Sequence, residues 1–199
     1  MKERILVTGG TGYIGSHTVV ELQNSGYDVV IVDNLSNSSA DVVDNIEKVS
    51  GIRPAFEKLD CLDLEGMDKL FTKYPGIKGI IHFAASKAVG ESVQKPLLYY
   101  RNNLVSLINL LELMPKHGVE GIIFSSSCTV YGQPDVLPVT EEAPIKKAES
   151  PYGNTKQINE EIIRDTVASG SPINAIMLRY FNPIGAHPTA LIGHDRSEE

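Results

Sequence analysis

The sequence contains only two cysteines, and it lacks any apolar run near the length of a membrane span. Neither Cys61 nor Cys128 belongs to a CxxC pair or has metal-ligand spacing, and such sparse cysteine usage is typical of a reducing compartment. A membrane-spanning helix needs about 20 consecutive apolar residues. Residues 1–8 also lack the basic segment and the roughly 7–15-residue apolar run of a secretion signal. We therefore expect a cytoplasmic protein without a membrane partner.

Basic residues are outnumbered by acidic ones. Lys and Arg together number 18, against 25 Asp and Glu, so the formal net charge is −7. A surface of this charge repels nucleic acid, although a local positive pocket could bind an anionic ligand. The five histidines lack metal-ligand spacing, and His82, within an apolar run, is interpreted as a buried core residue. The sequence thus predicts neither a nucleic-acid partner nor a metal site.

Short apolar runs alternate with segments of helical periodicity. The runs predict strands at Ile5–Val7, Val29–Val32, Ala55–Lys58, Gly79–Phe83, Gly121–Ser125 and Ile173–Leu178. Helices are expected at Tyr13–Asn24, Ala40–Val49, Leu64–Lys73, Leu97–Met114 and Pro151–Ala168. Strands that are apolar on both faces and separated by helices form parallel sheets covered on both sides. We therefore expect an α/β fold with a doubly wound, Rossmann-like parallel sheet of order 3-2-1-4-5-6.

Three glycines follow the first predicted strand at intervals of three residues. Gly9, Gly12 and Gly15 lie where that strand gives way to a helix, which is the setting of a dinucleotide site. Glycine permits a tight turn and lets backbone N–H groups approach a pyrophosphate, while the helix N-terminus adds a partial positive charge. A strand–helix turn without a ligand is the alternative interpretation of the glycines alone.

Asp33 ends the second predicted strand and strengthens the dinucleotide hypothesis. A carboxylate there can accept hydrogen bonds from the adenosine ribose hydroxyls, and it would repel a 2′-phosphate. No arginine follows directly, because the next residues are Asn34, Leu35 and Ser36. A turn or capping role is the alternative interpretation of Asp33 alone. Together with the glycines, it predicts NAD rather than NADP.

Tyr152 and Lys156 form a YxxxK pair at the start of the last predicted helix. Their spacing places both side chains on one helix face. A free tyrosine has a pKa near ~10, but a nearby ammonium and a cationic nicotinamide favour the phenolate. Ser127 ends the fifth strand, where ligand-facing residues of open α/β sheets lie. Although YxxxK is common on surface helices, this combination predicts that Tyr152 accepts a proton from a sugar hydroxyl.

These motifs together resemble the extended short-chain dehydrogenase/reductase superfamily and, within it, the UDP-glucose 4-epimerase family. The segments that carry the resemblance are VTGGTGYIGSH (Val7–His17), HFAASKAVGESVQ (His82–Gln94), FSSSCTVYG (Phe124–Gly132), SPYGNTK (Ser150–Lys156) and LRYFNPIGAH (Leu178–His187). The resemblance implies an NAD-binding domain over residues 1–188 and a divergent or truncated tail over 189–199. It also implies that the family's C-terminal substrate domain is largely missing from this chain.

The resemblance assigns a role to each site residue. It implies that Tyr152 is the proton acceptor, that Lys156 tunes it and holds the nicotinamide ribose, and that Ser127 helps to position the sugar. The implied substrate contacts are Ser127, Tyr152 and Asn182. Besides the glycine loop, the implied NAD contacts are Tyr13, Ile14, Asp33, Asn34, Ser38, Asp60, Cys61, Phe83, Ala84, Lys87, Asn102 and Phe181. Small departures from the family pattern occur at Ala85, Ser86 and Cys128, and none removes a catalytic group.

The activity implied by the resemblance is epimerisation at C4 of a UDP-hexose through a 4-keto sugar, within galactose metabolism and in a homodimeric enzyme. We expect this chain, as a fragment, to have reduced activity or none. A nucleotide-sugar dehydratase or decarboxylase is one alternative, but a dehydratase usually carries an Asp-Glu pair where this chain has Cys128 and Thr129. An NAD-binding, non-catalytic paralogue is another, although such proteins commonly lose the Tyr or Lys that this chain keeps.

Overall fold

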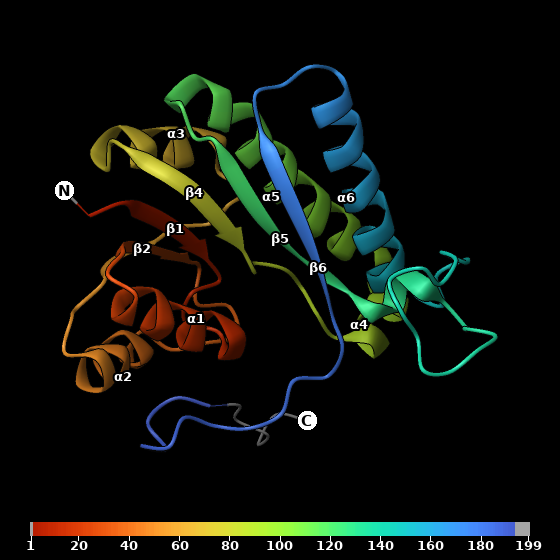
Figure 1. Cartoon of the computed structure of the whole chain (residues 1–199), viewed down its shortest axis with the longest axis horizontal. Coiled ribbons are helices and arrows are strands. Elements are labelled where there is room, and N and C mark those ends of the chain that lie inside the picture. Colours follow the sequence, from red (N-terminus) through yellow and green to blue (C-terminus); the bar gives the residue numbers. More distant parts are fainter. Residues whose placement is uncertain (1, 194–199) are drawn as a thin grey trace.

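The computed structural model describes residues 2–193, which form a six-stranded parallel sheet between two layers of helices (Figure 1). The strand order is β3-β2-β1-β4-β5-β6, as the sequence predicted, and every neighbouring pair is parallel. The strands are β1 Arg4–Thr8, β2 Asp28–Asp33, β3 Ala55–Lys58, β4 Ile77–His82, β5 Gly121–Ser127 and β6 Asn174–Tyr180. All six carboxyl ends therefore meet at one edge of the sheet.

The helices agree with the expected ones apart from a few differences. They are α1 Tyr13–Asn24, α2 Asp41–Ser50, α3 Leu64–Lys73, α4 Val89–Gln94, α5 Pro96–His117, α6 Pro151–Ala168 and the 3-10 helix η1 Cys128–Tyr131. The short α4 and η1 were not predicted. Helix α5 also continues past Met114, the last residue of the predicted range, through Pro115, and stops at Gly118, whose φ of 66° is left-handed. Proline this close to the end costs the helix only one internal hydrogen bond.

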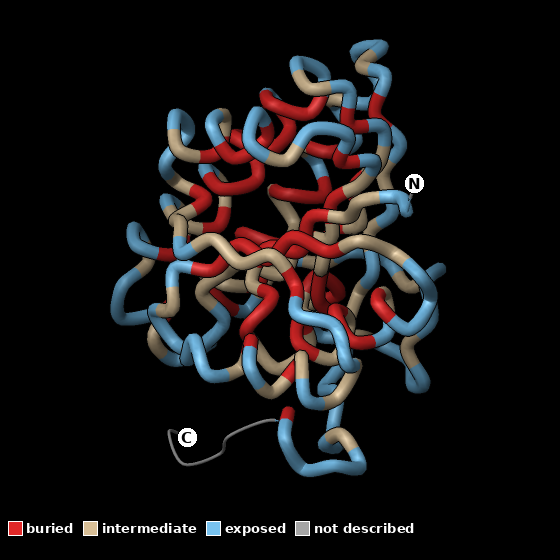
Figure 2. Tube along the Cα trace, turned by 90° about the vertical axis from the view of Figure 1, so that its left-hand side faces the viewer, coloured by how far each residue is buried: buried red, intermediate tan, exposed pale blue. Residues whose placement is uncertain are grey.

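The core consists of two apolar clusters, one on each face of the sheet. Because successive strand residues point to opposite faces, Leu6 enters the cluster beneath α3, α5 and α6, while Val7 enters the cluster beneath α1 and α2. Both side chains are fully buried. Figure 2 shows the buried residues gathered along the sheet and the inner sides of the helices. Burial on both faces explains why the strands read as continuous apolar runs.

The segment after β6 returns across the sheet edge to α1. Tyr13 Oη donates a hydrogen bond to Gly185 O at 2.7 Å. Ile192 is buried in the cluster that includes Val19 of α1. Residues 189–193 of the expected tail are thus described, whereas residues 194–199 lie outside the described residues. Among residues 2–193, no helix has the length and apolar character needed to cross a membrane.

Candidate cofactor and catalytic site

The residues singled out from the sequence gather where the strands end. Gly9, Gly12, Tyr13, Ile14 and Gly15 connect β1 to α1, and the remaining residues fall after the other strands or on two helices. Asp33 ends β2 with Asn34 and Ser38 following, Asp60 and Cys61 follow β3, Phe83, Ala84 and Lys87 follow β4, Ser127 ends β5, Phe181 and Asn182 follow β6, Asn102 lies in α5, and Tyr152 and Lys156 lie in α6. Ligands of open α/β sheets bind at this edge.

The glycine turn excludes side chains from the space next to the β4 end. Gly9 has a φ of 69°, and a Cβ atom there would lie 2.7 Å from Ala84 N. A Cβ atom at Gly15 would overlap Gly9 O and lie 2.8 Å from Gly10 Cα. Gly12 at the N-cap of α1 brings no side chain to the N–H groups of the first helical turn. The turn can therefore bring its backbone close to an anionic ligand.

Asp33 ties the end of β2 to the glycine turn. Its Oδ2 accepts a hydrogen bond from Thr11 N at 3.2 Å, and its Oδ1 accepts from Leu35 N at 2.9 Å. Ser38 Oγ also donates to Oδ1 at 3.3 Å. Leu35 has a left-handed φ of 60°, which the carboxylate stabilises. The turn role that the sequence left open is therefore real, and Thr11 joins the site without having been predicted.

The segment after β3 places a buried thiol beside two carboxylates. Asn34 Nδ2 donates to Asp60 Oδ2 at 3.0 Å, and Leu62 N donates to Asp60 Oδ1 at 2.9 Å. Burial, followed by the negative charges of Asp60 and Asp33, raises the pKa of Cys61 to about 12. A thiol in this environment stays protonated at neutral pH and serves as a packing residue, not as a nucleophile.

The first two turns of α6 carry Tyr152 and Lys156 next to the end of β5. Ser150 caps the helix by accepting a hydrogen bond from Gly153 N at 3.1 Å. Lys156 Nζ lies 5.7 Å from the centre of the Tyr152 ring. Ser127 is 8% exposed, and its Oγ accepts from Thr129 N at 3.2 Å and Thr129 Oγ1 at 3.0 Å. A hydroxyl, a phenol and an ammonium are thus grouped at this edge.

Burial changes the pKa values of both Lys156 and Tyr152. Lys156 is buried, its Nζ donates to Ser125 O at 2.7 Å, and burial lowers its pKa to about 8. Burial raises the pKa of Tyr152, and a hydrogen bond with Ser127 acts in the opposite direction. In the protein without a ligand, the ammonium is directed at a strand carbonyl and the phenol is desolvated. The expectation that Lys156 and a cationic nicotinamide together favour the phenolate stays a prediction.

His82 is a satisfied core residue, as the sequence indicated. It is 2% exposed, and its Nδ1 shares a hydrogen bond with Thr8 Oγ1 at 2.7 Å. Burial, and then the charge of Lys156, lowers the pKa of His82 to about 3. Within residues 2–193, no group of histidine, cysteine and acidic side chains could hold a metal ion.

A buried amide connects the loop after β4 to the helix that carries the tyrosine. Asn103 Oδ1 accepts from Ser86 N at 2.9 Å, and Asn103 Nδ2 donates to Thr155 Oγ1 at 3.1 Å. The neighbouring Asn102 Nδ2 donates to Ser86 Oγ at 2.9 Å. The sequence analysis missed Asn103, although two adjacent asparagines within a largely apolar helix are a visible signal.

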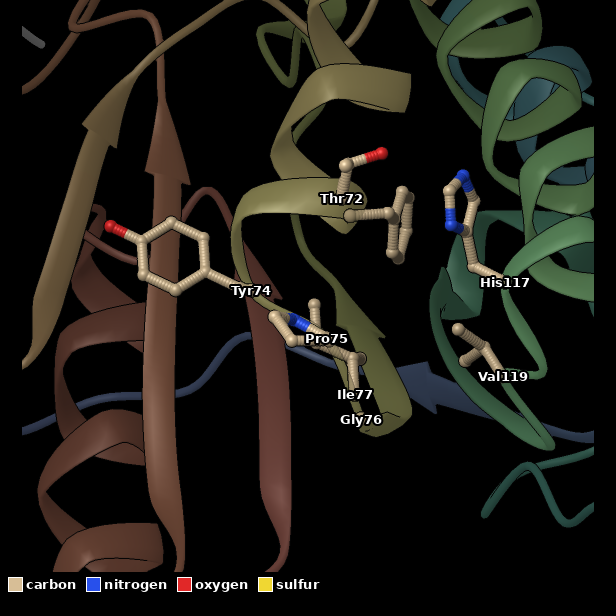
Figure 3. Close-up of a pocket in the computed structure, with 8 residues that line it drawn as sticks. Thr72, Tyr74, Pro75, Gly76, Ile77, His117 and Val119 are labelled. Atoms are coloured by element: carbon tan, nitrogen blue, oxygen red, sulfur yellow. The ribbon is translucent and has the colours of Figure 1, made fainter.

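A separate hollow of about 280 Å3 lies at the opposite edge of the sheet (Figure 3). It is bounded by Pro75 and Ile77 at the start of β4 and by His117 and Val119 around the end of α5. The His117 ring stacks on Phe71, with 5.2 Å between the ring centres. None of the residues of the glycine turn or the YxxxK pair lines this hollow, so it is not part of the candidate site.

Comparison with known proteins agrees with this geometry. The chain is 51% identical to a UDP-glucose 4-epimerase of Dictyostelium discoideum, over 97% of this chain and 56% of that protein. The epimerase of Stenotrophomonas maltophila, solved with NAD and formylated UDP-arabinopyranose, is 46% identical, with a TM-score of 0.94. That of Bifidobacterium longum, solved with NAD+ and UDP, is 47% identical, with the same TM-score of 0.94.

The two solved structures extend well past the matched region. The match covers 98% and 96% of this chain but 58% and 57% of those two chains. This chain therefore spans little more than half the length of the relatives it matches. The family model described as "NAD dependent epimerase/dehydratase family" matches residues 5–197. The chain belongs to the NAD dependent epimerase/dehydratase family, and its similarity to UDP-glucose 4-epimerases bears out the resemblance of its motifs.

Proposed function

We propose that the protein carrying this chain binds NAD and interconverts UDP-galactose and UDP-glucose by epimerisation at C4, as a step of galactose metabolism. The observation that carries the proposal is the grouping of Ser127, Tyr152 and Lys156 at the same sheet edge as the glycine turn. The relatives that share this chain's sequence and fold are UDP-glucose 4-epimerases, and two of them hold NAD together with UDP or a UDP-sugar.

The glycine turn and Asp33 fit an NAD molecule. Gly9 lets the turn pack tightly against the backbone of Ala84, and Gly12 leaves the N–H groups at the start of α1 without a side-chain cap, so a pyrophosphate can approach them. Asp33 is the last residue of β2, where a carboxylate can accept hydrogen bonds from the adenosine ribose, and its negative charge disfavours a 2′-phosphate. Bound NAD would supply the acceptor for the C4 hydride and return that hydride later. The contacts named from the resemblance, from Tyr13 to Phe181, are the residues proposed to hold it.

Residues of this chain transfer the proton and orient the sugar. Tyr152 takes the proton of the 4″-hydroxyl as C4 is oxidised, and it returns the proton after the 4-keto sugar has turned over. Ser127 hydrogen-bonds the reacting oxygen, and Asn182 contacts the nucleotide sugar. Burial raises the pKa of free Tyr152, so the phenolate requires the nearby Lys156 and a cationic nicotinamide ring together. Cofactor binding would thereby promote loss of the Tyr152 proton, and the resulting phenolate can accept the proton of the sugar hydroxyl.

The sequence after Ser127 lacks the acidic pair that a dehydratase usually carries, and the chain keeps the residues that a non-catalytic paralogue commonly loses. A dehydratase must protonate a leaving hydroxyl at C6, but the residues that follow Ser127 are Cys128 and Thr129. Thr129 instead donates a hydrogen bond to Ser127 Oγ, which orients the serine. A non-catalytic paralogue would not need the Tyr152 and Lys156 pair. This chain keeps both residues, with Lys156 Nζ 2.7 Å from Ser125 O of β5 and 5.7 Å from the centre of the Tyr152 ring.

We also propose a homodimer, formed through the outer face of α4 and α5. Six large apolar side chains of these two helices are exposed, and exposed apolar surface favours association. They are Val89, Val93, Leu97, Leu98, Val105 and Ile108. Sedimentation at several concentrations tests this, and a Leu97→Glu exchange should shift the chain toward monomer.

The expected cytoplasmic location stays a prediction.

The test of the proposed reaction is direct. The whole protein is incubated with UDP-galactose, and the formation of UDP-glucose is measured with a coupled dehydrogenase. We expect turnover by the wild type and none by Tyr152→Phe, which keeps the ring and removes the proton acceptor, with NAD binding unchanged. Near wild-type turnover by Tyr152→Phe would show that the base is misassigned.

The 199-residue chain alone should be a poor epimerase. Phe181 is 56% exposed and Asn182 is exposed, so the sugar side of the site is open. Such catalysis depends on binding energy from the remote nucleotide and on a closed site that retains the 4-keto sugar. Turnover by the chain alone within the usual enzyme range of roughly 1–10³ per second would contradict this view of the site.

A further inference from the structure

One buried charge close to the YxxxK pair has no part in the proposed chemistry. Glu160 lies in α6, four residues after Lys156 and eight after Tyr152, so the three side chains share one helix face. Its side chain is completely buried. A carboxylate in the interior is costly unless it is paired and hydrogen-bonded, so its surroundings must compensate for this cost.

Arginine side chains supply the compensating charge. Arg179 of β6 donates two hydrogen bonds to the carboxylate, from Nε to Oε1 at 2.9 Å and from Nη2 to Oε2 at 2.8 Å. Arg164 Nη2 adds a third contact to Oε2 at 2.6 Å from the more exposed side. Burial alone would raise the pKa of Glu160, but the hydrogen bonds from Arg179 and Ser126 hold it below its usual value. Glu160 is therefore an ionised, bidentate anchor between α6 and β6.

The Glu160–Arg179 ion pair also contacts side chains on both sides of Ser127 in the sequence. Ser126 Oγ donates to Glu160 Oε1 at 2.6 Å. Arg179 Nη1 donates to Tyr131 Oη at 2.9 Å, and the guanidinium lies 4.8 Å from the centre of the Tyr131 ring. Ser126 directly precedes Ser127, and Tyr131 ends the 3-10 helix that directly follows it. The elements that bear the hydroxyl, phenol and ammonium thus converge on one ion pair.

We propose that Glu160 is a positioning residue, whose ion pair with Arg179 sets the register of α6 against β5 and so fixes Tyr152 and Lys156 relative to Ser127. The directional geometry of the Glu160–Arg179 hydrogen bonds favours a positioning role over a purely stabilising one. A bidentate pair tolerates little sliding, whereas apolar contacts of similar size would permit it. Buried ion pairs are also often replaceable by apolar residues without loss of stability. The consequence for catalysis rests on the proposed function, but the placement of Tyr152 does not.

The test compares Glu160→Gln with Arg164→Gln. The first keeps the size of the side chain and removes its charge, and the second is the control, because Glu160 keeps Arg179 as its partner. Two quantities are measured in the whole protein: turnover of UDP-galactose, and the pKa of Tyr152 with and without NAD. The pKa is read from phenolate absorbance, with Tyr152→Phe subtracted to remove the other tyrosines.

A positioning role predicts a specific pattern. In Glu160→Gln, kcat should fall about 10- to 100-fold, the loss expected for a misplacement of about 1 Å, while KM and NAD binding stay within about twofold. The pKa of Tyr152 should also differ from its value in the wild type. Arg164→Gln should resemble the wild type in all of these. If folded Glu160→Gln keeps its kcat and its Tyr152 titration, the proposal is overturned.

A second variant covers failure of Glu160→Gln to fold. The double variant Glu160→Met with Arg179→Leu removes both charges of the ion pair. The side chain of the remaining partner, Arg164, is 44% exposed and can be solvated, so the variant should fold and bind NAD. If Glu160 positions Tyr152, the pKa of Tyr152 and kcat of this double variant should still differ from the wild-type values. Wild-type values of both would show that the ion pair only stabilises the fold, and they would overturn the proposal. Absence of UDP-hexose turnover in the wild type would instead reject the proposed function, and the Tyr152 titration would still decide the role of Glu160.

Discussion

Lys156 Nζ donates its hydrogen bond to the carbonyl oxygen of Ser125, at 2.7 Å, and not to the phenol of Tyr152. The lysine therefore anchors α6 to β5 two residues before Ser127. Its ammonium also lies 4.9 Å from the centre of the Phe124 ring, in an apolar setting. This placement makes the charge of Lys156 sensitive to pH in a range where lysines are normally fully protonated.

The pH dependence of stability should show this burial. Burial lowers the pKa of Lys156 to about 8, while in the unfolded chain it returns to about 10.4. Between these values the unfolded state binds more protons, so the lysine's contribution to the free energy of unfolding rises with pH. Lys156→Met should lack this rise, and the exposed Lys147→Met should keep it. Denaturant unfolding at pH 7 to 10 measures the slopes, and equal slopes for Lys156→Met and the wild type would refute the burial effect.

His82 predicts a loss of stability in acid. Its pKa is lowered to about 3 by burial, so it stays neutral in the fold while the unfolded chain gains a proton below about pH 6.5. The folded state therefore loses stability as pH falls from about 6.5 toward 3, by roughly 1.4 kcal/mol per pH unit at most. His82→Gln should lose stability less steeply, and His17→Gln, at a partly exposed position of α1, is the control for a histidine outside the core. Parallel curves for His82→Gln and the wild type would contradict this.

Two helical glycines should respond oppositely to alanine. A Cβ atom at Gly15 would overlap Gly9 O, whereas one at Gly90 in α4 would meet no atom within 4 Å. Gly15→Ala should therefore lower the free energy of unfolding by about 1–3 kcal/mol, as overpacking does, and weaken NAD binding. Gly90→Ala should be neutral or stabilising by up to about 1 kcal/mol, because alanine favours helix. Calorimetric binding and denaturant unfolding measure both, and equal behaviour of the two variants would contradict the glycine-turn account.

The two cysteines should differ in reactivity. Cys61 is 5% exposed, with a pKa of about 12, while Cys128 is partly exposed. At pH 8, iodoacetamide should modify Cys128 and leave Cys61 intact until denaturant is added. Peptide mass spectrometry at timed intervals reads the two sites. Rapid modification of Cys61 in the folded protein would show that this part of the site is open.

The strand order and the location of the site were predictable from sequence because their signals are local. Apolar runs mark strands buried on both faces, and the strand carboxyl ends then bring Gly9, Asp33 and Ser127 to one edge. Helix α4 was not predicted, because a six-residue helix is too short to show a periodicity. The predicted range of the long helix ends at Met114, whereas α5 continues through Pro115, which is tolerated because it lies in the last turn.

The chemistry of individual side chains was less predictable. The pKa of Tyr152 depends on how deeply the phenol is buried and where the Lys156 ammonium points, and neither follows from a spacing of four residues. The pairing of Glu160 with Arg179 joins two elements whose contact arises only when β6 adds to the sheet edge. Only the polar position of Glu160 on the face of Tyr152 and Lys156 was visible beforehand.

The central claim is a dinucleotide site selective for NAD, and one titration tests it most directly. NAD and NADP are each titrated into the 199-residue chain by calorimetry, after any carried-over nucleotide has been released and assayed. With Asp33 at the end of β2 and no arginine directly after it, NAD should bind at least ~10-fold more tightly, a difference of about 1.4 kcal/mol. NADP binding as tightly as NAD, or no saturable binding of NAD at all, would contradict the account.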